Sequence, residues 1–318
     1  MQRLRFVLSV LPALLTICMP GIVRGQDYPN KPIRVVTTAP GGSADVVMRV
    51  VAQGLAPTLG QPMVIDNRGL IGAELVSKAA PDGYTLLVDG ASVWISSLLQ
   101  KTPYDPVKDF SPIMVVAATP NVLVVHVSVP ANSVADLIAW AKAKAGALNY
   151  ASGGTGGTSH LAGELFKAMT GASIVHVPYK GTGPAVGALV AGEVQLLFAG
   201  AATVLPHVKS GRIRAIAVAS PKPSALAPGL PTVSASGLPG FESVLLICMF
   251  APARTPTSVI NKVNREIARV LSGPDVIARL ANAGLEPYPN SPDEFAVLLK
   301  ADLSKWGKLI RDVGIRAN

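Results

Sequence analysis

Three short glycine-rich turns carry the residue types that could bind an anion. They lie at 40–45, 152–159 and 180–183 and read PGGSAD, SGGTGGTS and KGTG. Each places hydroxyl side chains beside glycines, and each stands where a helix is expected to begin. Backbone N–H groups at a helix start, together with the positive end of the helix dipole, favour carboxylates and phosphates. Any one of these turns is a weak signal, because many α/β proteins turn in this way only to pack.

The first turn is positioned by a strand before it and a helix after it. Residues 33–36 form an apolar, β-branched run that is typical of a buried strand. The Pro40-Gly41-Gly42 sequence ends this run, and Ser43 is expected to cap a helix that keeps its apolar spacing to Leu55. The turn therefore lies at the carboxyl end of a strand, where open α/β sheets bind their ligands.

The same strand–turn–helix arrangement recurs along the chain. Further strands are predicted at 63–65, 85–88, 148–151, 174–177, 194–198, 213–219 and 244–250, and helices at 72–80, 133–145, 160–169, 257–271 and 291–299. The apolar stretch 113–129 is interrupted by Pro120-Asn121, which predicts two consecutive strands and a crossing between domains. The stretch 221–239, rich in Pro, Ala and Ser, is interpreted as an ordered surface excursion or a linker. The order predicts two α/β halves, and if they face each other the three turns converge on one cleft.

Residues 1–25 have the composition of a signal peptide. Arg3 and Arg5 precede an apolar run at 6–17, and small residues stand before Gln26. A retained membrane anchor is the competing interpretation, but a membrane span needs about 20 apolar residues. Removal of this segment lowers the net charge from +9 to +6, because it contains three arginines and no acidic residue.

Charge and cysteine content exclude several classes of protein. The lysines and arginines are scattered along the chain rather than massed in one patch, so no nucleic-acid partner is expected. Cys248 is the single cysteine outside the signal peptide, so no internal disulfide is expected. Its apolar neighbours indicate a core residue rather than a nucleophile.

A secreted enzyme is the rival class, and the sequence offers it little support. There is no G-x-S-x-G or Walker A motif, and no histidine stands near Ser43 in the sequence. The histidines at 126, 160, 176 and 207 lack the spacing of metal ligands. Neither catalysis nor a cofactor or metal is therefore expected.

Several strings spread in order over nearly the whole mature chain carry a resemblance to a known family. They are PGGSAD, KAAPDGYTLL, PYDPVKDFSPI, LNYASGG, SHLAGELFKAMTG, VHVPYKGTGPA, GLPTVSASGLPGFE and FAPARTP. Together they resemble the periplasmic receptors of tripartite tricarboxylate transporters, the Bug-type solute-binding proteins. The resemblance implies a two-lobed periplasmic-binding fold of type II character, with a mostly parallel sheet flanked by helices in each lobe. It assigns 26–120 and 243–318 to lobe 1 and 121–242 to lobe 2.

The resemblance also implies a function. The protein is expected to be a periplasmic monomer that captures a small organic carboxylate between its lobes and delivers it to membrane permease subunits. A binding protein that serves a signalling partner is the alternative that sequence does not separate from transport. With Ser92 and Lys180 included, the predicted ligand-binding residues are Gly41, Gly42, Ser43, Ala44, Asp45, Ser92, Ser152, Thr155, Thr158, Lys180, Thr182 and Gly183.

Three departures from the family pattern bear on which carboxylate is bound. The loop after Arg68 is shorter than usual, and Ala199 stands where the family often has an acidic residue. An aromatic–glycine pair before the APA segment is replaced by residues 246–248, Leu-Ile-Cys. These departures concern the identity of the ligand rather than the fold.

Overall fold

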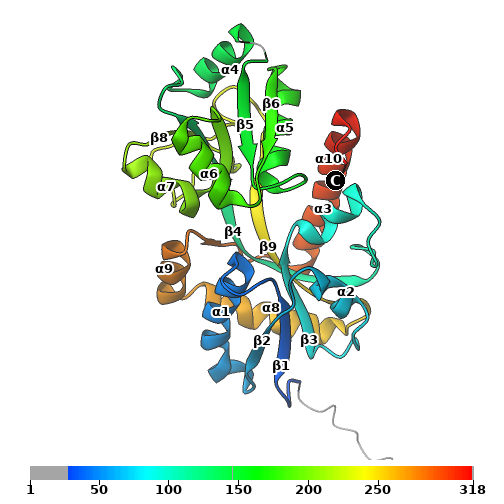
Figure 1. Cartoon of the computed structure of the whole chain (residues 1–318). Coiled ribbons are helices and arrows are strands. Elements are labelled where there is room, and N and C mark those ends of the chain that lie inside the picture. Colours follow the sequence, from blue (N-terminus) through cyan, green and yellow to red (C-terminus); the bar gives the residue numbers. More distant parts are fainter. Residues whose placement is uncertain (1–27, 145, 317–318) are drawn as a thin grey trace, which may run out of the picture.

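A computed structural model describes residues 28–144 and 146–316. The predicted signal peptide at 1–25 lies outside these residues. Two lobes are stacked one above the other, joined by strands that run between them, and the C-terminal helix rises along one side (Figure 1).

The strands form one continuous, curled sheet. They are β1 (Ile33–Thr37), β2 (Met63–Asn67), β3 (Thr85–Gly90), β4 (Phe110–His126), β5 (Leu148–Ser152), β6 (Ile174–Pro178), β7 (Leu196–Gly200), β8 (Ile213–Val218), β9 (Val244–Pro252) and β10 (Glu286–Pro287). Their order is β2-β1-β3-β9-β4-β7-β5-β6, with β10 and β8 also paired to β4. Parallel pairs flank β1 and β5, whereas β9 and β4 pair antiparallel with their neighbours. The sheet is therefore mixed, and its parallel parts are those that carry strand–turn–helix units.

Helices cover both faces of each half of the sheet. They are α1 (Ser43–Leu59), α2 (Gly72–Ser77), α3 (Ser92–Leu99), α4 (Val134–Ala143), α5 (Thr158–Thr170), α6 (Thr182–Ala191), α7 (Ala201–Lys209), α8 (Thr257–Leu271), α9 (Pro274–Asn282) and α10 (Pro292–Val313), with the short 3-10 helix η1 (Gly69–Ile71) before α2. Two apolar clusters flank the β1 half and two flank the β5 half. We call the β1 half, with β2, β3, β9 and β10, lobe 1, and the β5 half, with β6, β7 and β8, lobe 2.

The prediction of two strands over 113–129 is wrong, because β4 is one strand that passes through Pro120. Its first part pairs with β9 as far as Pro120, and its second part pairs with β7 from Asn121 onward. Proline has no N–H to donate to a ladder. Pro120 stands where β4 changes its partner from β9 to β7, so the missing donor falls at the boundary between the two ladders.

Helix boundaries differ from the predictions in two places that matter for the site. Gly42, not Ser43, is the N-cap of α1, and Ser43 is its first helical residue. Helix α5 begins at Thr158, so its first turn includes hydroxyl residues that the sequence assigned to the loop. The helix at 257–271 and the capping box at Ser291 are confirmed, although α10 continues to Val313.

A buried polar cluster lies in lobe 2 beneath the 152–159 loop. The rings of His160 and His176 stack with centroids 3.9 Å apart, and Tyr150 stacks on His176 at 4.9 Å. The Tyr150 hydroxyl donates to Glu164 at 2.6 Å, and Lys167 forms an ion pair with the same carboxylate at 2.8 Å. Burial and the neighbouring His160 lower the pKa of His176 to about 4. Burial also lowers the pKa of His160, so both imidazole rings are neutral in the folded protein at pH 7.

Two helical glycines make a matched pair for testing the packing of this cluster. A Cβ atom at Gly163 in α5 would stand 2.2 Å from the Tyr150 ring, whereas one at Gly187 in α6 would meet nothing within 4 Å. We expect Gly163→Ala to destabilise the fold by roughly 1–3 kcal/mol through overpacking. Gly187→Ala should stabilise it by roughly 0.5–1 kcal/mol, because alanine restricts the unfolded chain. Urea denaturation of both variants measures these changes, and equal effects would contradict the packing described.

The histidine stack predicts a loss of stability in mild acid. Unfolded histidines take up protons near pH 6.5, whereas the folded protein resists protonation of His176 until about pH 4. The unfolded state therefore binds more protons between these values, and the free energy of unfolding falls as the pH falls through this window. Asp45 does not contribute to this loss of stability. Its pKa is lowered from 3.8 to about 2, so the stability that it adds is lost only as the pH falls below 3.8.

Thermal melts between pH 7 and pH 4 measure this effect. His176→Gln is the control, since its amide can still hydrogen-bond to Ser152 but does not titrate. We expect the variant to show a shallower decline in melting temperature above pH 4.5 than the wild type. Identical slopes for the two proteins would rule out the histidine stack as the cause.

Candidate ligand-binding cleft

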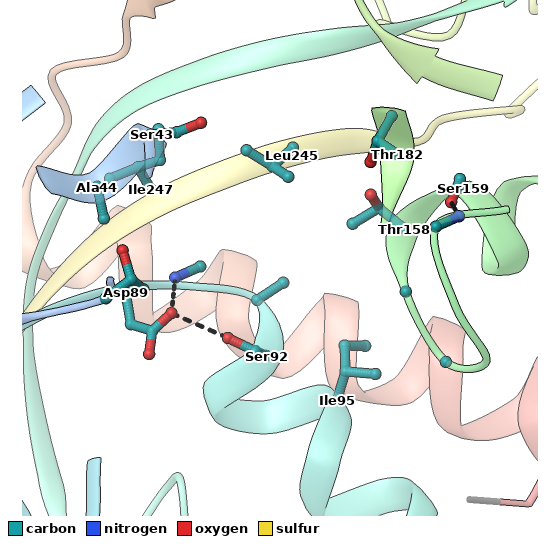
Figure 2. A pocket seen from close by; sticks show the side chains of 16 residues that line it. Ser43, Ala44, Asp89, Ser92, Ile95, Thr158, Ser159, Thr182, Leu245 and Ile247 are labelled. Atoms are coloured by element: carbon teal, nitrogen blue, oxygen red, sulfur yellow. Dashed lines mark hydrogen bonds between the residues drawn. The ribbon is translucent and has the colours of Figure 1, made fainter. Parts of the chain in front are cut away.

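Two adjoining cavities lie between the lobes. The main cavity, of about 360 Å³, is lined by Thr38, Ser43, Ala44, Asp89, Gly90, Ala91, Ser92, Ile95, Gly153, Gly156, Gly157, Thr158, Ser159, Thr182, Leu245 and Ile247. The hinge-side cavity, of about 160 Å³, shares Ser43, Thr158, Ser159, Thr182 and Leu245 and continues to Thr119, Asn121, Ala199, Gly200, Ala202, Thr203, Ala283, Gly284 and Leu285. Figure 2 shows Ser43 and Ala44 on one side of the main cavity and Thr158 and Thr182 on the other, with Leu245 between them.

Three helices begin beside both cavities without side-chain caps, and the uncapped starts of α3 and α7 each lie at one of the two cavities. The N-caps of α1, α5 and α6 are Gly42, Gly157 and Gly181, and none makes a side-chain cap hydrogen bond. The residues after these glycines, Ser43, Thr158 and Thr182, all line both cavities. The first N–H groups of a helix have no acceptor within the helix, so these three starts direct unsatisfied donors and positive dipole ends toward one space.

The amides of Gly41 and Gly42, two residues predicted to bind a ligand, are hydrogen-bonded within the first turn. The Gly41 N–H donates to the Asp45 carboxylate at 3.0 Å, and the Gly42 N–H donates to the Ala39 carbonyl at 3.1 Å. Gly41 has a positive φ of 78°, a conformation that favours glycine, whereas Gly42 has a φ of −68°. Both glycines shape the turn, and the donors left for a ligand belong to the first residues of α1.

Asp45 holds this turn from behind rather than lining a cavity. Its buried carboxylate accepts hydrogen bonds from Arg49 at 3.0 Å and from Asn67 at 2.9 Å, in addition to the Gly41 N–H. The hydrogen bond from Arg49 is the largest contribution to a lowered pKa of about 2 for Asp45, so the carboxylate stays charged. The Asn67 amide also donates to the Thr38 carbonyl at 2.7 Å, which ties the turn to the end of β2.

The 152–159 loop is also held by internal hydrogen bonds. Its glycine amides donate inward, Gly153 to the Ser159 hydroxyl at 3.0 Å and Gly156 to His160 Nδ1 at 2.9 Å. The buried Ser152 hydroxyl hydrogen-bonds to His176 Nε2 at 2.6 Å. The histidine stack therefore supports the loop whose far side forms the wall of the cleft.

The structure brings together part of the predicted site. Ser43, Ala44, Ser92, Thr158 and Thr182 line the main cavity. The other predicted residues line neither of the two cavities: Gly41, Gly42, Asp45, Ser152, Thr155, Lys180 and Gly183. Asp45 and Ser152 are buried inside their loops, whereas Lys180 and Gly183 are exposed outside the cleft. Direct contact of these seven residues with a ligand stays a prediction.

The sequence did not predict several of the residues that line the cavities. Leu245 and Ile247 reach the main cavity from the same face of β9, and Thr119 reaches the hinge-side cavity from β4. Nothing in the local pattern of these apolar strands distinguishes a residue that faces a cleft from one that faces a core. Asp89 could have been found, because it ends β3 in the same way that the glycine turns end β1 and β5.

Asp89 is the single charged side chain among the described residues that line the two cavities. Its carboxylate accepts the Gly90 N–H at 2.6 Å and the Ser92 hydroxyl at 3.0 Å, just before the start of α3 (Figure 2). Burial raises the pKa of Asp89, although these two hydrogen bonds oppose the effect. The rest of the lining is neutral, so an anion would be held there by backbone dipoles and hydroxyl groups.

The described residues offer no metal centre and no membrane-spanning helix. No group of three His, Cys, Asp or Glu side chains lies close enough to hold a metal ion in the described parts of the chain. No helix among those parts is both long and apolar enough to cross a bilayer.

Comparisons with known proteins agree with this architecture. A family model for the tripartite tricarboxylate transporter family receptor matches residues 47–315. The chain is 36% identical to the protein BugT of Bordetella pertussis over 324 residues, which cover 99% of each chain.

Two solved structures are similar over nearly the same span. Rpa4515 of R. palustris with adipate is 35% identical, with a TM-score of 0.76 over 91% of this chain and 99% of the other. MatC from Rhodopseudomonas palustris with bound malate is 31% identical, with a TM-score of 0.70 over 89% and 100%. The matching family consists of receptors rather than enzymes, as the sequence predicted. This chain therefore belongs to the family of tripartite tricarboxylate transporter receptors, which includes the Bug-type periplasmic solute-binding proteins.

Proposed function

We propose that this protein captures a small organic carboxylate in the cleft between its lobes and delivers it to the permease subunits of a tripartite transporter. The observation that carries the proposal is the convergence of three uncapped helix starts, at Ser43, Thr158 and Thr182, on one cavity. A carboxylate there would accept the N–H groups that the helices leave unsatisfied. Two similar proteins were solved with adipate and malate, both small carboxylates, which supports the same ligand class.

The proposal includes a cellular setting. Cleavage after residue 25 would release a monomeric chain into the periplasm, where the family's receptors work. We place the lobe boundaries at 120/121 and 242/243, because the described chain passes between lobes on β4 and again just before β9. The side chain of Asn121 donates to the Ser243 hydroxyl at 2.9 Å, which joins the two crossing segments.

Carboxylate binding is tested with a variant that fills the cleft without disturbing the fold. Gly157 lines the main cavity with extended backbone angles, and a Cβ atom there would meet only the Gly154 carbonyl, at 3.4 Å. We expect Gly157→Val to abolish binding while the protein stays folded. Gly42→Val is less suitable, because a Cβ atom at Gly42 would lie 2.9 Å from Thr38 Oγ1 and distort the turn.

A thermal-shift screen of mono-, di- and tricarboxylates provides the measurement. A ligand at 100 times its Kd should stabilise the wild type by roughly 2.7 kcal/mol. Gly187→Ala, which lies outside both cavities, is the folded control and should bind as the wild type does. The proposal fails if only neutral sugars or metal ions raise the midpoint, or if a folded Gly157→Val protein binds normally.

Ligand binding should also bring the lobes together. The segments 119–121 and 241–244 are expected to act as the hinge, because the chain passes between lobes there. Small-angle X-ray scattering should give a smaller radius of gyration at ligand saturation than without ligand. Gly157→Val at the same ligand concentration is the control for solvent effects, and an unchanged radius for the wild type at saturation would contradict closure.

A further inference from the structure

The main cavity has two chemically different ends. One end is formed by the starts of α1, α5 and α6 and offers hydrogen-bond donors. The other end is formed by the end of β3 and the uncapped start of α3, and it adds an acidic acceptor, Asp89, which the first end lacks. Figure 2 shows Asp89 below Ala44, with Ser92 beside it, along the lower side of the cavity.

Asp89 has no positively charged partner in the described part of the chain. Its hydrogen-bond partners are the Gly90 N–H and the Ser92 hydroxyl, and both donate to the same oxygen, Oδ1. None of the ion pairs among the described residues includes Asp89. Asp89 is half-buried and lies beside the start of α3, so a donor from another molecule would further stabilise its carboxylate.

A second carboxylate at this end of the cavity would meet a like charge. Two carboxylates that share a small site repel each other, and one of them must then be protonated. An ammonium group would form an ion pair with Asp89, and a hydroxyl group would donate a hydrogen bond to it. The cavity therefore favours a ligand that has a carboxylate at one end and a hydrogen-bond donor at the other.

We propose that Asp89 determines ligand specificity, so that the protein prefers carboxylates with an ammonium or hydroxyl group at the far end over dicarboxylates of the same length. This inference rests on the proposed carboxylate function and names the ligand class of the same site. In a bound complex the carboxylate lies against Ser43, Thr158 and Thr182, and the donor group lies against Asp89 Oδ2, the oxygen that takes neither of the two hydrogen bonds above.

The test compares ligands that differ only at the far end. The probes are 4-aminobutyrate, 4-hydroxybutyrate, butyrate and succinate, together with the homologous sets that are one and two carbons longer. Calorimetric titration of the full mature protein at pH 7 gives the Kd of each. In the chain length that binds best, we expect the amino or hydroxy acid to bind at least about tenfold more tightly than the dicarboxylate.

Two substitutions test whether the Asp89 carboxylate causes this preference. Asp89→Asn keeps an amide oxygen that can accept from Gly90 and Ser92, so the start of α3 should stay intact while the charge is lost. We expect this variant to bind the amino acid at least about tenfold more weakly and the dicarboxylate more tightly than the wild type does. Asp312→Asn makes the same change in net charge at an exposed position on α10 and should leave the order of affinities unchanged.

The outcomes separate this inference from the proposed function. A wild-type protein that binds the dicarboxylate most tightly would overturn the role of Asp89, although carboxylate binding would stand. Equal changes for every probe in the Asp89→Asn variant would also overturn it, because a structural defect does not discriminate between ligand ends. Absence of binding by every carboxylate in the panel and in the wider screen would count against the proposed function itself.

Discussion

The amide groups at the starts of α1, α5 and α6 need acceptors that their own helices do not supply. Each helix begins after a glycine that makes no side-chain cap, and the following residue lines the same cavity. At two other helices these N–H groups are satisfied locally, since Ser133 and Ser291 form complete capping boxes at α4 and α10. The starts of α1, α5 and α6 have no such side-chain acceptor and face the cleft instead.

Buried polar groups hold the turns that carry these helix starts. Behind the first turn, Asp45 accepts hydrogen bonds from Arg49 and Asn67, and behind the 152–159 loop the rings of His160 and His176 stack. Such groups are costly to bury unless their hydrogen bonds are made. Asp45 accepts the Gly41 N–H, and the two histidines bond to the Gly156 N–H and the Ser152 hydroxyl, so each buried cluster supports the shape of its loop.

The two walls of the cleft belong to different lobes, so the cleft forms only where the two connecting segments hold the lobes face to face. β4 changes partners at Pro120, and the return crossing is joined to it through Asn121 and Ser243.

Across the cleft the lobes also touch closely. A Cβ atom at Gly156 would stand 2.3 Å from Leu99, and one at Gly284 would stand 2.1 Å from Ala202. Glycine at these positions permits an approach that side chains would prevent.

The sequence by itself determined the strand–turn–helix units, the family and the residue types of the turns, because these follow from local spacing and composition. The sequence could therefore predict that Ser43, Thr158 and Thr182 share a cleft, and all three line both cavities. The tertiary structure decided which donors remain free. The Gly41 amide donates to Asp45, which folds back over the turn, and the Gly42 amide donates to the Ala39 carbonyl. It also decided that Asp89 lines the same cavity as the three helix starts, because only the packing of the two lobes brings these distant segments of the chain together.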